Sequence, residues 1–189
     1  NAGIAVGGEV RELALEDWRD AVEVNLMGVV HGVQAAWPRM VGQDFGHVVN
    51  TASMAAFMAT ALAAPYGATK SAIVGLSRAL RVEGAAHGLR VSVLCPGVVR
   101  TPILESGGRH GRVPAFLDPD LQKALWERTR PMDVDAFARK SLDDVASNRA
   151  VIVHPAWWRI LRFLNGVAPS LMDVLGRREL AKIRALRAA

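Results

Sequence analysis

Short buried strand patterns alternate with long helical patterns along this chain, and this alternation limits the fold most strongly. The strand patterns are residues 47–53, 90–95 and 150–154, and the helical patterns are residues 9–41, 65–84 and 133–148. The strand runs are rich in β-branched residues and are too short for helices. Strands that alternate with helices run parallel and are joined by right-handed crossovers, which leave helices on both faces. The order predicts an α/β fold with a doubly wound parallel sheet.

The first helical pattern carries a regular apolar stripe. Its members recur at steps of three and four residues, as one face of a helix requires: Trp18, Val22, Leu26, Val29, Val33 and Trp37. Pro65 is well placed at the start of the next helix, where its missing N–H costs nothing. We expect residues 102–132 to be an irregular loop, because they combine several glycines and prolines with mixed charges.

The charge of the chain is concentrated at its C-terminal end. The net charge is +5, from 23 Lys and Arg against 18 Asp and Glu. Residues 155–189 hold seven of the basic and two of the acidic residues, so the preceding 154 residues hold 16 of each and are neutral. We therefore divide the chain into a domain over residues 1–154 and a basic, amphipathic helical tail over residues 155–189.

Several classes of site receive no support from the sequence. Cys95 is the only cysteine, so no internal disulfide is expected. No apolar run reaches the ~20 residues of a membrane-spanning helix. Nucleic-acid binding is disfavoured because the basic residues do not form a stripe with interleaved aromatics. The histidines lack ligand spacing, so no metal site is expected; they are His31, His47, His87, His110 and His154.

Three residues form a candidate catalytic set. Tyr66 and Lys70 are four residues apart on a predicted helix, so their side chains leave the same face about 5–6 Å apart. Ser53 ends the preceding strand, and reactive groups of open α/β sheets gather beyond the carboxyl ends of strands. Proton transfer coupled to hydride transfer needs these residue types. An ammonium ~4 Å away stabilises a phenolate by roughly 4 kcal/mol, which would lower the tyrosine pKa of ~10 by about three units.

Each residue also has a plain structural reading. A Tyr-x-x-x-Lys pair alone is more often a surface pair, and a serine at a strand end is often a helix cap. The combination and its spacing favour the catalytic reading.

The chain resembles the short-chain dehydrogenase/reductase family. Ser53 and Tyr66 stand thirteen residues apart, as the catalytic serine and tyrosine of that family usually do. The stretch 66–72 is similar to the family's active-site helix, and residues 24–28 to the helix that carries a catalytic asparagine. Residues 1–3 resemble the end of its Asn-Asn-Ala-Gly motif, and residues 95–101 its Pro-Gly segment. The resemblance covers residues 1 to about 154 and implies the C-terminal part of a Rossmann-like fold.

The resemblance implies roles for the catalytic residues. Tyr66 is the general acid/base, and Ser53 orients the substrate oxygen. Lys70 lowers the pKa of Tyr66 and binds the nicotinamide ribose, so both Tyr66 and Lys70 adjoin the cofactor. Asn25 holds a water that links Lys70 to a proton relay, or instead caps a helix irregularity.

The resemblance also implies contacts with NAD or NADP. Val99 and Thr101 contact the nicotinamide carboxamide, while Pro96 and Gly97 let the backbone approach the cofactor closely. Asn1, Ala2 and Gly3 lie against the adenosine end.

The sequence departs from the family at its start. The glycine-rich turn that binds pyrophosphate is absent, because Gly7 and Gly8 follow no strand and are interpreted as a loop. The chain opens at Asn1 rather than Met, so we expect further sequence upstream, and the preference between NAD and NADP cannot be read. Residues 1–189 alone are expected neither to bind a dinucleotide tightly nor to catalyse, and to expose a sheet edge around residues 48–51.

The function expected from the resemblance is the interconversion of a secondary alcohol and a ketone by a cytoplasmic homodimer or homotetramer. Its helices 9–41 and 65–84 pack across the subunit interface. Met54, Phe57 and Met58 either line an apolar substrate pocket or belong to the core or an interface, and residues 102–132 are either a substrate lid or an ordinary connection. Two alternatives remain: a catalytically silent sensor or scaffold, and a membrane-surface protein that acts through residues 155–189. Residues 155–189 either dock on a membrane surface or cover the substrate cleft or a partner subunit.

Overall fold

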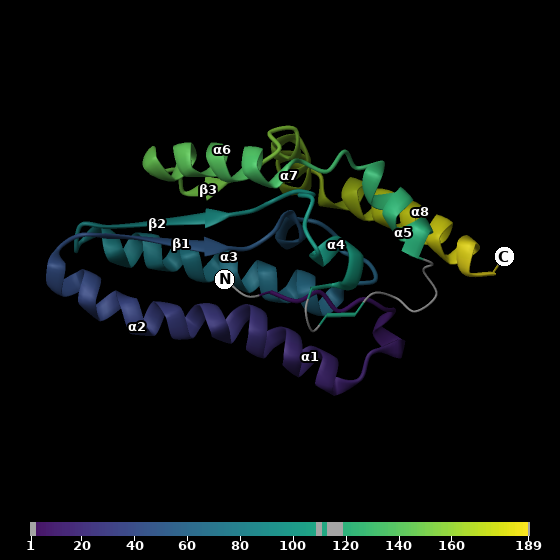
Figure 1. The fold of residues 1–189 in the computed structure, drawn as a ribbon, viewed down its shortest axis with the longest axis horizontal. Coiled ribbons are helices and arrows are strands. Elements are labelled where there is room, and N and C mark those ends of the chain that lie inside the picture. Colours follow the sequence, from purple (N-terminus) through teal and green to yellow (C-terminus); the bar gives the residue numbers. More distant parts are fainter. Residues whose placement is uncertain (1–2, 109–110, 113–118, 189) are drawn as a thin grey trace.

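A parallel sheet lies between two layers of helices. The computed structural model describes residues 3–108, 111–112 and 119–188. Strands β1 (Gly46–Thr51), β2 (Leu89–Leu94) and β3 (Val151–Ile152) form a sheet in the order β1-β2-β3 with parallel pairing throughout. Helices α2 (Gly28–Gln43) and α3 (Ala64–Ala85) cover one face, and α6 (Val134–Ala146) covers the other (Figure 1). The predicted doubly wound α/β fold is confirmed.

The first helical region is not the single helix that residues 9–41 predicted. It consists of a 3-10 turn η1 (Val10–Glu12), α1 (Leu15–Ala21), a π-helical segment η2 (Val22–Met27) and α2. The wider π turn shifts the helical register, so Asn25 is completely buried while Val22, an expected member of the apolar stripe, is 40% exposed. The later part of the stripe is confirmed, because Val33 is buried and Trp37 packs against it.

The segment between Ser53 and Tyr66 is short and largely packed. A 3-10 turn η3 (Met54–Phe57) follows β1, and α3 then begins with Pro65 in its first turn. Met54 is buried in the main core beside Ile73 and Val93. For Met54 the core reading is therefore correct, whereas Phe57 and Met58 are only partly buried at the margin of that core.

Residues 102–132 contain more regular structure than the predicted loop. Helices α4 (Ile103–Ser106) and α5 (Pro119–Glu127) lie within this range. Asp133 then caps α6, because its carboxylate accepts a hydrogen bond of 2.9 Å from the backbone N–H of Ala136. The prolines and glycines lie at the helix ends and not in their interiors, because Pro102 is the N-cap of α4, Gly107 is its C-cap and Pro119 is the first residue of α5.

The open edge of the sheet lies at β1. Among the described residues β1 pairs only with β2, and Val49 is 39% exposed. Cys95, beyond the end of β2, is fully buried, and burial raises the pKa of its thiol to about 12. It behaves as a small hydrophobic residue, as expected.

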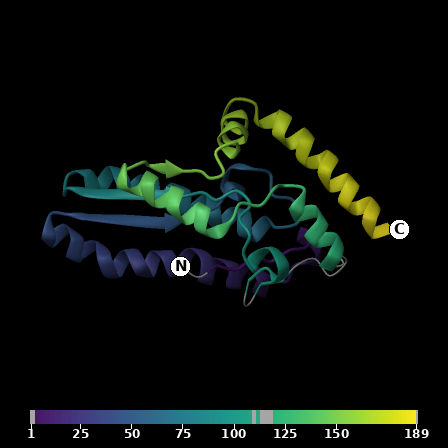
Figure 2. The same cartoon turned by 45° about the horizontal axis from the view of Figure 1, so that its top comes forward.

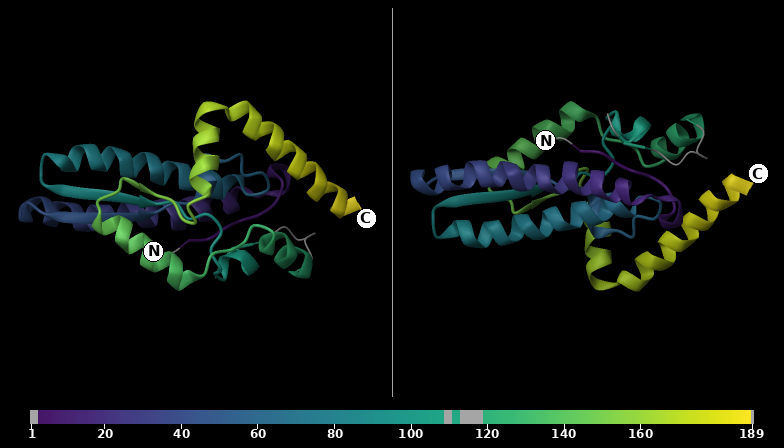
Figure 3. Two further views of the ribbon diagram at one scale, coloured as in Figure 1. Left: turned by 90° about the horizontal axis from the view of Figure 1, so that it is seen from above. Right: turned by 90° about the horizontal axis from the view of Figure 1, so that it is seen from below.

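The C-terminal tail forms two helices, α7 (Trp158–Val167) and α8 (Pro169–Ala188). They stand away from the sheet and form an angle, with α8 extending past the carboxyl ends of the strands (Figures 2 and 3). No helix in the described ranges has the length and apolar character needed to cross a bilayer.

A carboxylate anchors the start of the tail to the domain. Asp144 on α6 lies 2.9 Å from Nε2 of His154, and its other oxygen lies 2.8 Å from Nε of Arg149. Arg159 on α7 reaches the same carboxylate at 3.4 Å and donates to the Val153 carbonyl oxygen at 3.2 Å. Because the cluster joins α6, β3 and α7, it defines the direction in which the tail leaves the sheet.

The indole of Trp158 packs directly on Gly97. Trp158 is 9% exposed and belongs to the main core. A Cβ atom at position 97 would overlap the five-membered part of the indole ring. Glycine is therefore required at this position by the packing of α7 on the end of β2.

We predict that Gly97→Ala lowers the free energy of unfolding by about 1–3 kcal/mol, as overpacking of a core does. The matched control is Gly75→Ala on α3, where a Cβ atom would meet nothing within 4 Å. That change should raise stability by about 0.5–1 kcal/mol, because alanine favours the helix. Urea unfolding of both variants measures the difference, and equal stabilities would contradict the packing described.

Candidate active site

Ser53 stands where β1 leaves the sheet. It occupies the N-cap of η3, and its Oγ accepts a hydrogen bond of 3.1 Å from the backbone N–H of Ala55. Ser53 therefore caps a helical turn, as the structural interpretation of this residue predicts. It also holds the hydroxyl at the carboxyl edge of the strand, where ligands of α/β sheets bind.

Tyr66 lies in the first turn of α3 and meets Ser53. Burial raises the pKa of the Tyr66 phenol, and a side-chain hydrogen bond with Ser53 acts in the opposite direction. The structure therefore brings together the serine and tyrosine that the sequence separates by thirteen residues.

Lys70 lies one turn further along α3 and is 5% exposed. Its Nζ donates to the carbonyl oxygen of Thr51 at 3.1 Å and lies 5.5 Å from the centre of the Tyr66 ring. Burial lowers the pKa of Lys70 from 10.5 to about 8, and the nearby Cys95 thiol acts in the opposite direction.

The expectation that Lys70 lowers the pKa of Tyr66 is not met in this structure. The pKa of the phenol is raised, because desolvation outweighs the favourable hydrogen bond from Ser53. The ammonium is directed at the Thr51 carbonyl at the end of β1.

Asn25 is placed in the site by the π-helical segment. Its Oδ1 accepts from the backbone N–H of Ile4 at 2.8 Å, and its Nδ2 donates to the Ile4 carbonyl oxygen at 2.9 Å. Nδ2 also lies 3.2 Å from Oγ1 of Thr69, which donates to the Tyr66 carbonyl oxygen at 2.9 Å. Asn25 thus joins the N-terminal segment to the turn of α3 that carries Tyr66 and Lys70.

Gly3 borders the same site. A Cβ atom at this position would lie 3.6 Å from Oδ1 of Asn25 and 3.8 Å from Nζ of Lys70. Asn1 and Ala2, which the sequence also assigned to the cofactor, lie outside the described residues.

The Pro-Gly segment is placed at the same edge, but its glycine has a different surrounding from the expected one. The carbonyl oxygen of Pro96 accepts from the backbone N–H of Met54 at 2.8 Å, which ties the ends of β1 and β2 together. The space beside the Cα of Gly97 is filled by the Trp158 indole, so packing by itself requires glycine there. Val99 is buried, and Thr101 Oγ1 donates to the Val99 carbonyl oxygen at 3.4 Å.

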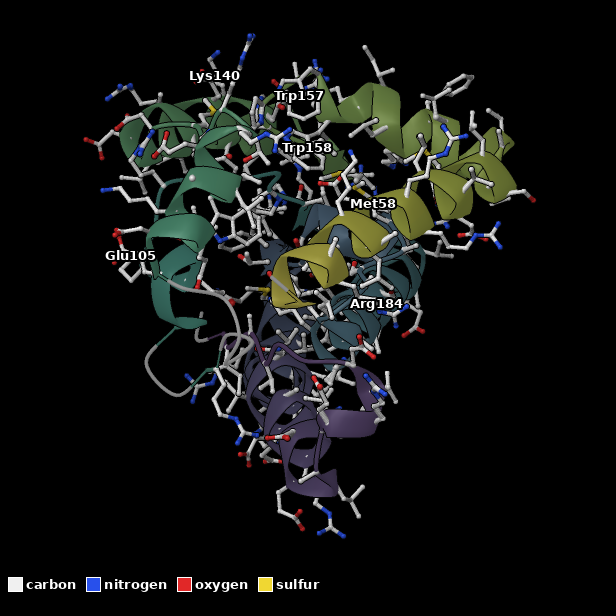
Figure 4. All side chains as sticks on the ribbon, turned by 90° about the vertical axis from the view of Figure 1, so that its right-hand side faces the viewer. Met58, Glu105, Lys140, Trp157, Trp158 and Arg184 are labelled. Carbon is white, nitrogen blue, oxygen red and sulfur yellow. The ribbon has the colours of Figure 1, made fainter. Side chains whose placement is uncertain are left out.

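The C-terminal tail passes over the loop before Tyr66, as the reading of residues 155–189 as a cover of the substrate cleft requires. Helix α8 crosses the loop before Tyr66: a Cβ atom at Gly176 would lie 3.6 Å from the Cβ of Ala59. Figure 4 shows Met58 beside α8, with Trp158 between α7 and the sheet. Arg184 forms an ion pair of 2.8 Å with Glu9, 175 residues away in sequence. No local pattern indicates a contact over that distance.

Sequence comparisons place the chain among oxidoreductases. A family model for short chain dehydrogenases matches residues 1–110. An uncharacterized oxidoreductase of Staphylococcus epidermidis is 36% identical over 105 residues, which cover 56% of this chain and 46% of that protein. One of Staphylococcus aureus is 33% identical over 137 residues, which cover 71% of this chain and 58% of that protein. The chain thus spans about half the length of these relatives.

Solved structures agree with the sequence comparisons. A short-chain dehydrogenase from Sphingobium yanoikuyae, in complex with NADPH, superposes with a TM-score of 0.70 at 26% identity and covers 92% of this chain and 62% of its own. A short-chain dehydrogenase/reductase from Burkholderia phymatum, in complex with NAD, gives 0.69 at 32% identity over 86% of this chain and 62% of its own. With the matched family model and the shared fold, the chain belongs to the short-chain dehydrogenase family.

Proposed function

We propose that this protein interconverts a secondary alcohol and a ketone with NAD or NADP. One observation carries the proposal: the Ser53 hydroxyl lies close enough to the Tyr66 phenol to act on its pKa at the carboxyl edge of the sheet, with the buried Lys70 on the next turn. The family membership and the nicotinamide complexes of two structural relatives support it.

Ser53 and Tyr66 divide the work on the substrate oxygen. In the reduction of a ketone, both hydroxyls donate hydrogen bonds to the carbonyl oxygen, and Tyr66 transfers its proton as the alkoxide forms. In the oxidation of an alcohol, the phenolate takes that proton back.

Lys70 suits the ribose of the cofactor. An ammonium has three N–H donors, and within the described ranges one of them binds the Thr51 carbonyl. The other donors suit ribose hydroxyl groups, and Gly3 leaves the adjoining space free of a side chain. The bound nicotinamide supplies or accepts the hydride.

Asn25, Thr101 and Val99 complete the proposed site. Asn25 holds the N-terminal segment and α3 in register, which positions Lys70. As the family resemblance implies, Thr101 and Val99 would contact the nicotinamide carboxamide. The resemblance also implies assembly into dimers or tetramers through α2 and α3.

The substrate side of the site is apolar. Phe57 and Met58 stand at the margin of the core beside Ser53, and Leu161 of α7 packs against the same core. Arg162 lies 5.2 Å from the centre of the Phe57 ring and shields it on the outer side. We propose a small substrate with an apolar body next to its carbonyl group.

Tyr66→Phe in the complete protein tests the chemical role. We expect kcat to fall by about 100-fold or more, because only the hydroxyl that transfers the proton is removed. The Kd for the cofactor should change little, because Lys70 remains in place. Steady-state turnover with a ketone panel and cofactor titration measure the two quantities. A variant that kept more than about a tenth of wild-type kcat would contradict the role of Tyr66 as acid/base.

The buried ammonium of Lys70 predicts a pH dependence of stability. The unfolded chain keeps the lysine proton up to pH about 10.5, whereas the folded chain releases it near pH 8. Between these values the unfolded state binds more protons, so the free energy of unfolding rises with pH, by up to roughly 3 kcal/mol for this group. Lys70→Met lacks this gain. Urea unfolding at several pH values from 7.5 to about 10 compares the proteins, and parallel pH profiles would show that Lys70 does not titrate in this range.

A further inference from the structure

The tail presents an uncovered apolar stripe to the outside of the molecule. Its members recur at steps of three and four residues within α7 and, separately, within the first part of α8, and all are exposed. We call them the outer stripe: Trp157, Ile160, Phe163, Val167, Leu171 and Leu175. Figure 4 shows Trp157 on the outer side of α7, with Trp158 beneath it.

The opposite side of α7 is also apolar, and that side is covered. Trp158 and Leu161 pack into the main core, and Met172 at the start of α8 is buried. Residues 157–164 are mostly apolar in sequence. The structure divides these apolar side chains between an inner half, which is covered, and an outer half, which is exposed. An apolar patch of this extent at the surface of a protein marks an interaction site.

Basic side chains continue the outer stripe along α8. Arg178 and Lys182 follow Leu175 at the same three- and four-residue steps, and Arg177 adjoins them. In the described part of the chain, Arg177 and Arg178 have no ion-pair partner. The tail has two acidic residues, Asp173 and Glu179. Glu179 forms an ion pair of 3.0 Å with Lys182.

We propose that the outer stripe docks on an anionic lipid surface, parallel to the membrane plane. The apolar side chains of α7 would enter the boundary between headgroups and acyl chains, with Trp157 at the headgroup level and the arginines of α8 on the lipid phosphates. A second copy of this chain fits less well, because a twofold contact through the stripe would bring the two basic α8 surfaces together.

The connection to the rest of the molecule is rigid enough to transmit this orientation. Asp144 holds the start of α7, and the ion pair between Arg184 and Glu9 holds the far part of α8. Docking would therefore orient the domain relative to the membrane. The proposal does not rest on catalysis, so its failure and the failure of the proposed reaction are separate results.

Vesicle sedimentation tests the proposal. The complete protein and residues 1–189 are each mixed with phosphatidylcholine vesicles, with or without about one third phosphatidylserine. Phe163→Ser removes an apolar side chain of the stripe, and Phe45→Ser is its matched control, since the exposed fractions of the two side chains are 66% and 65%. Arg177→Gln with Arg178→Gln removes two charges from α8, and Arg139→Gln with Lys140→Gln removes two exposed charges from α6. Circular dichroism confirms that each variant is folded.

We expect both forms of the protein to bind the anionic vesicles. Phe163→Ser and the α8 double variant should each lower the partition coefficient by about 5- to 10-fold or more, while the two controls stay within about twofold of wild type. Binding should weaken at high salt. Tryptophan fluorescence should shift to the blue with anionic vesicles, and Trp157→Phe should remove most of that shift.

Three outcomes would overturn the proposal. The first is no binding to anionic vesicles, or binding that both controls reduce equally. The second is binding by residues 1–189 but not by the complete protein, which would show that another part of the protein covers the stripe. The third is a dimer in light scattering that Phe163→Ser dissociates in the absence of lipid, which would assign the stripe to a second copy.

Discussion

The buried ammonium of Lys70 is the constraint on which the site depends. Its hydrogen bond to the Thr51 carbonyl ties α3 to the carboxyl end of β1, beside the point where Ser53 leaves the strand. A charge with 5% exposure is costly to bury, and folding tolerates it only because a carbonyl oxygen accepts from it and because its pKa falls. The buried ammonium also holds N–H donors at the place where the proposed function would put a ribose.

The π-helical segment η2 supports this arrangement from the other side. One wider turn carries Asn25 into the interior, where its amide pairs with both backbone groups of Ile4 and reaches Thr69. A buried amide with these partners pays little for desolvation, whereas the same amide on a regular helix surface would leave Ile4 unpaired. Irregular helical turns are frequent at functional sites, and this one links the N-terminal segment to the turn that carries Tyr66.

The C-terminal tail has an inner and an outer half. Its inner half packs Trp158 onto Gly97 and passes α8 over the loop before Tyr66, so it contributes to the surroundings of the site. Its outer half remains apolar and exposed, and Arg177 and Arg178 follow it along α8. One pair of helices thus packs over the loop before Tyr66 on its inner side and leaves the outer stripe exposed, while the cluster around Asp144 holds the start of α7.

The sequence by itself determined the fold class and nominated the candidate site residues, because both depend on local patterns. Strand and helix periodicity specified the parallel sheet, and the spacing of Ser53, Tyr66 and Lys70 specified which side chains would meet. Only the tertiary structure decided the register of the first helix, the direction of the Tyr66 pKa shift, the partner of Gly97 and the ion pair between Arg184 and Glu9. Each of these four features depends on which groups lose contact with water and on which distant segments pack together. The neighbours of a residue along the chain specify neither the loss of water nor the distant packing.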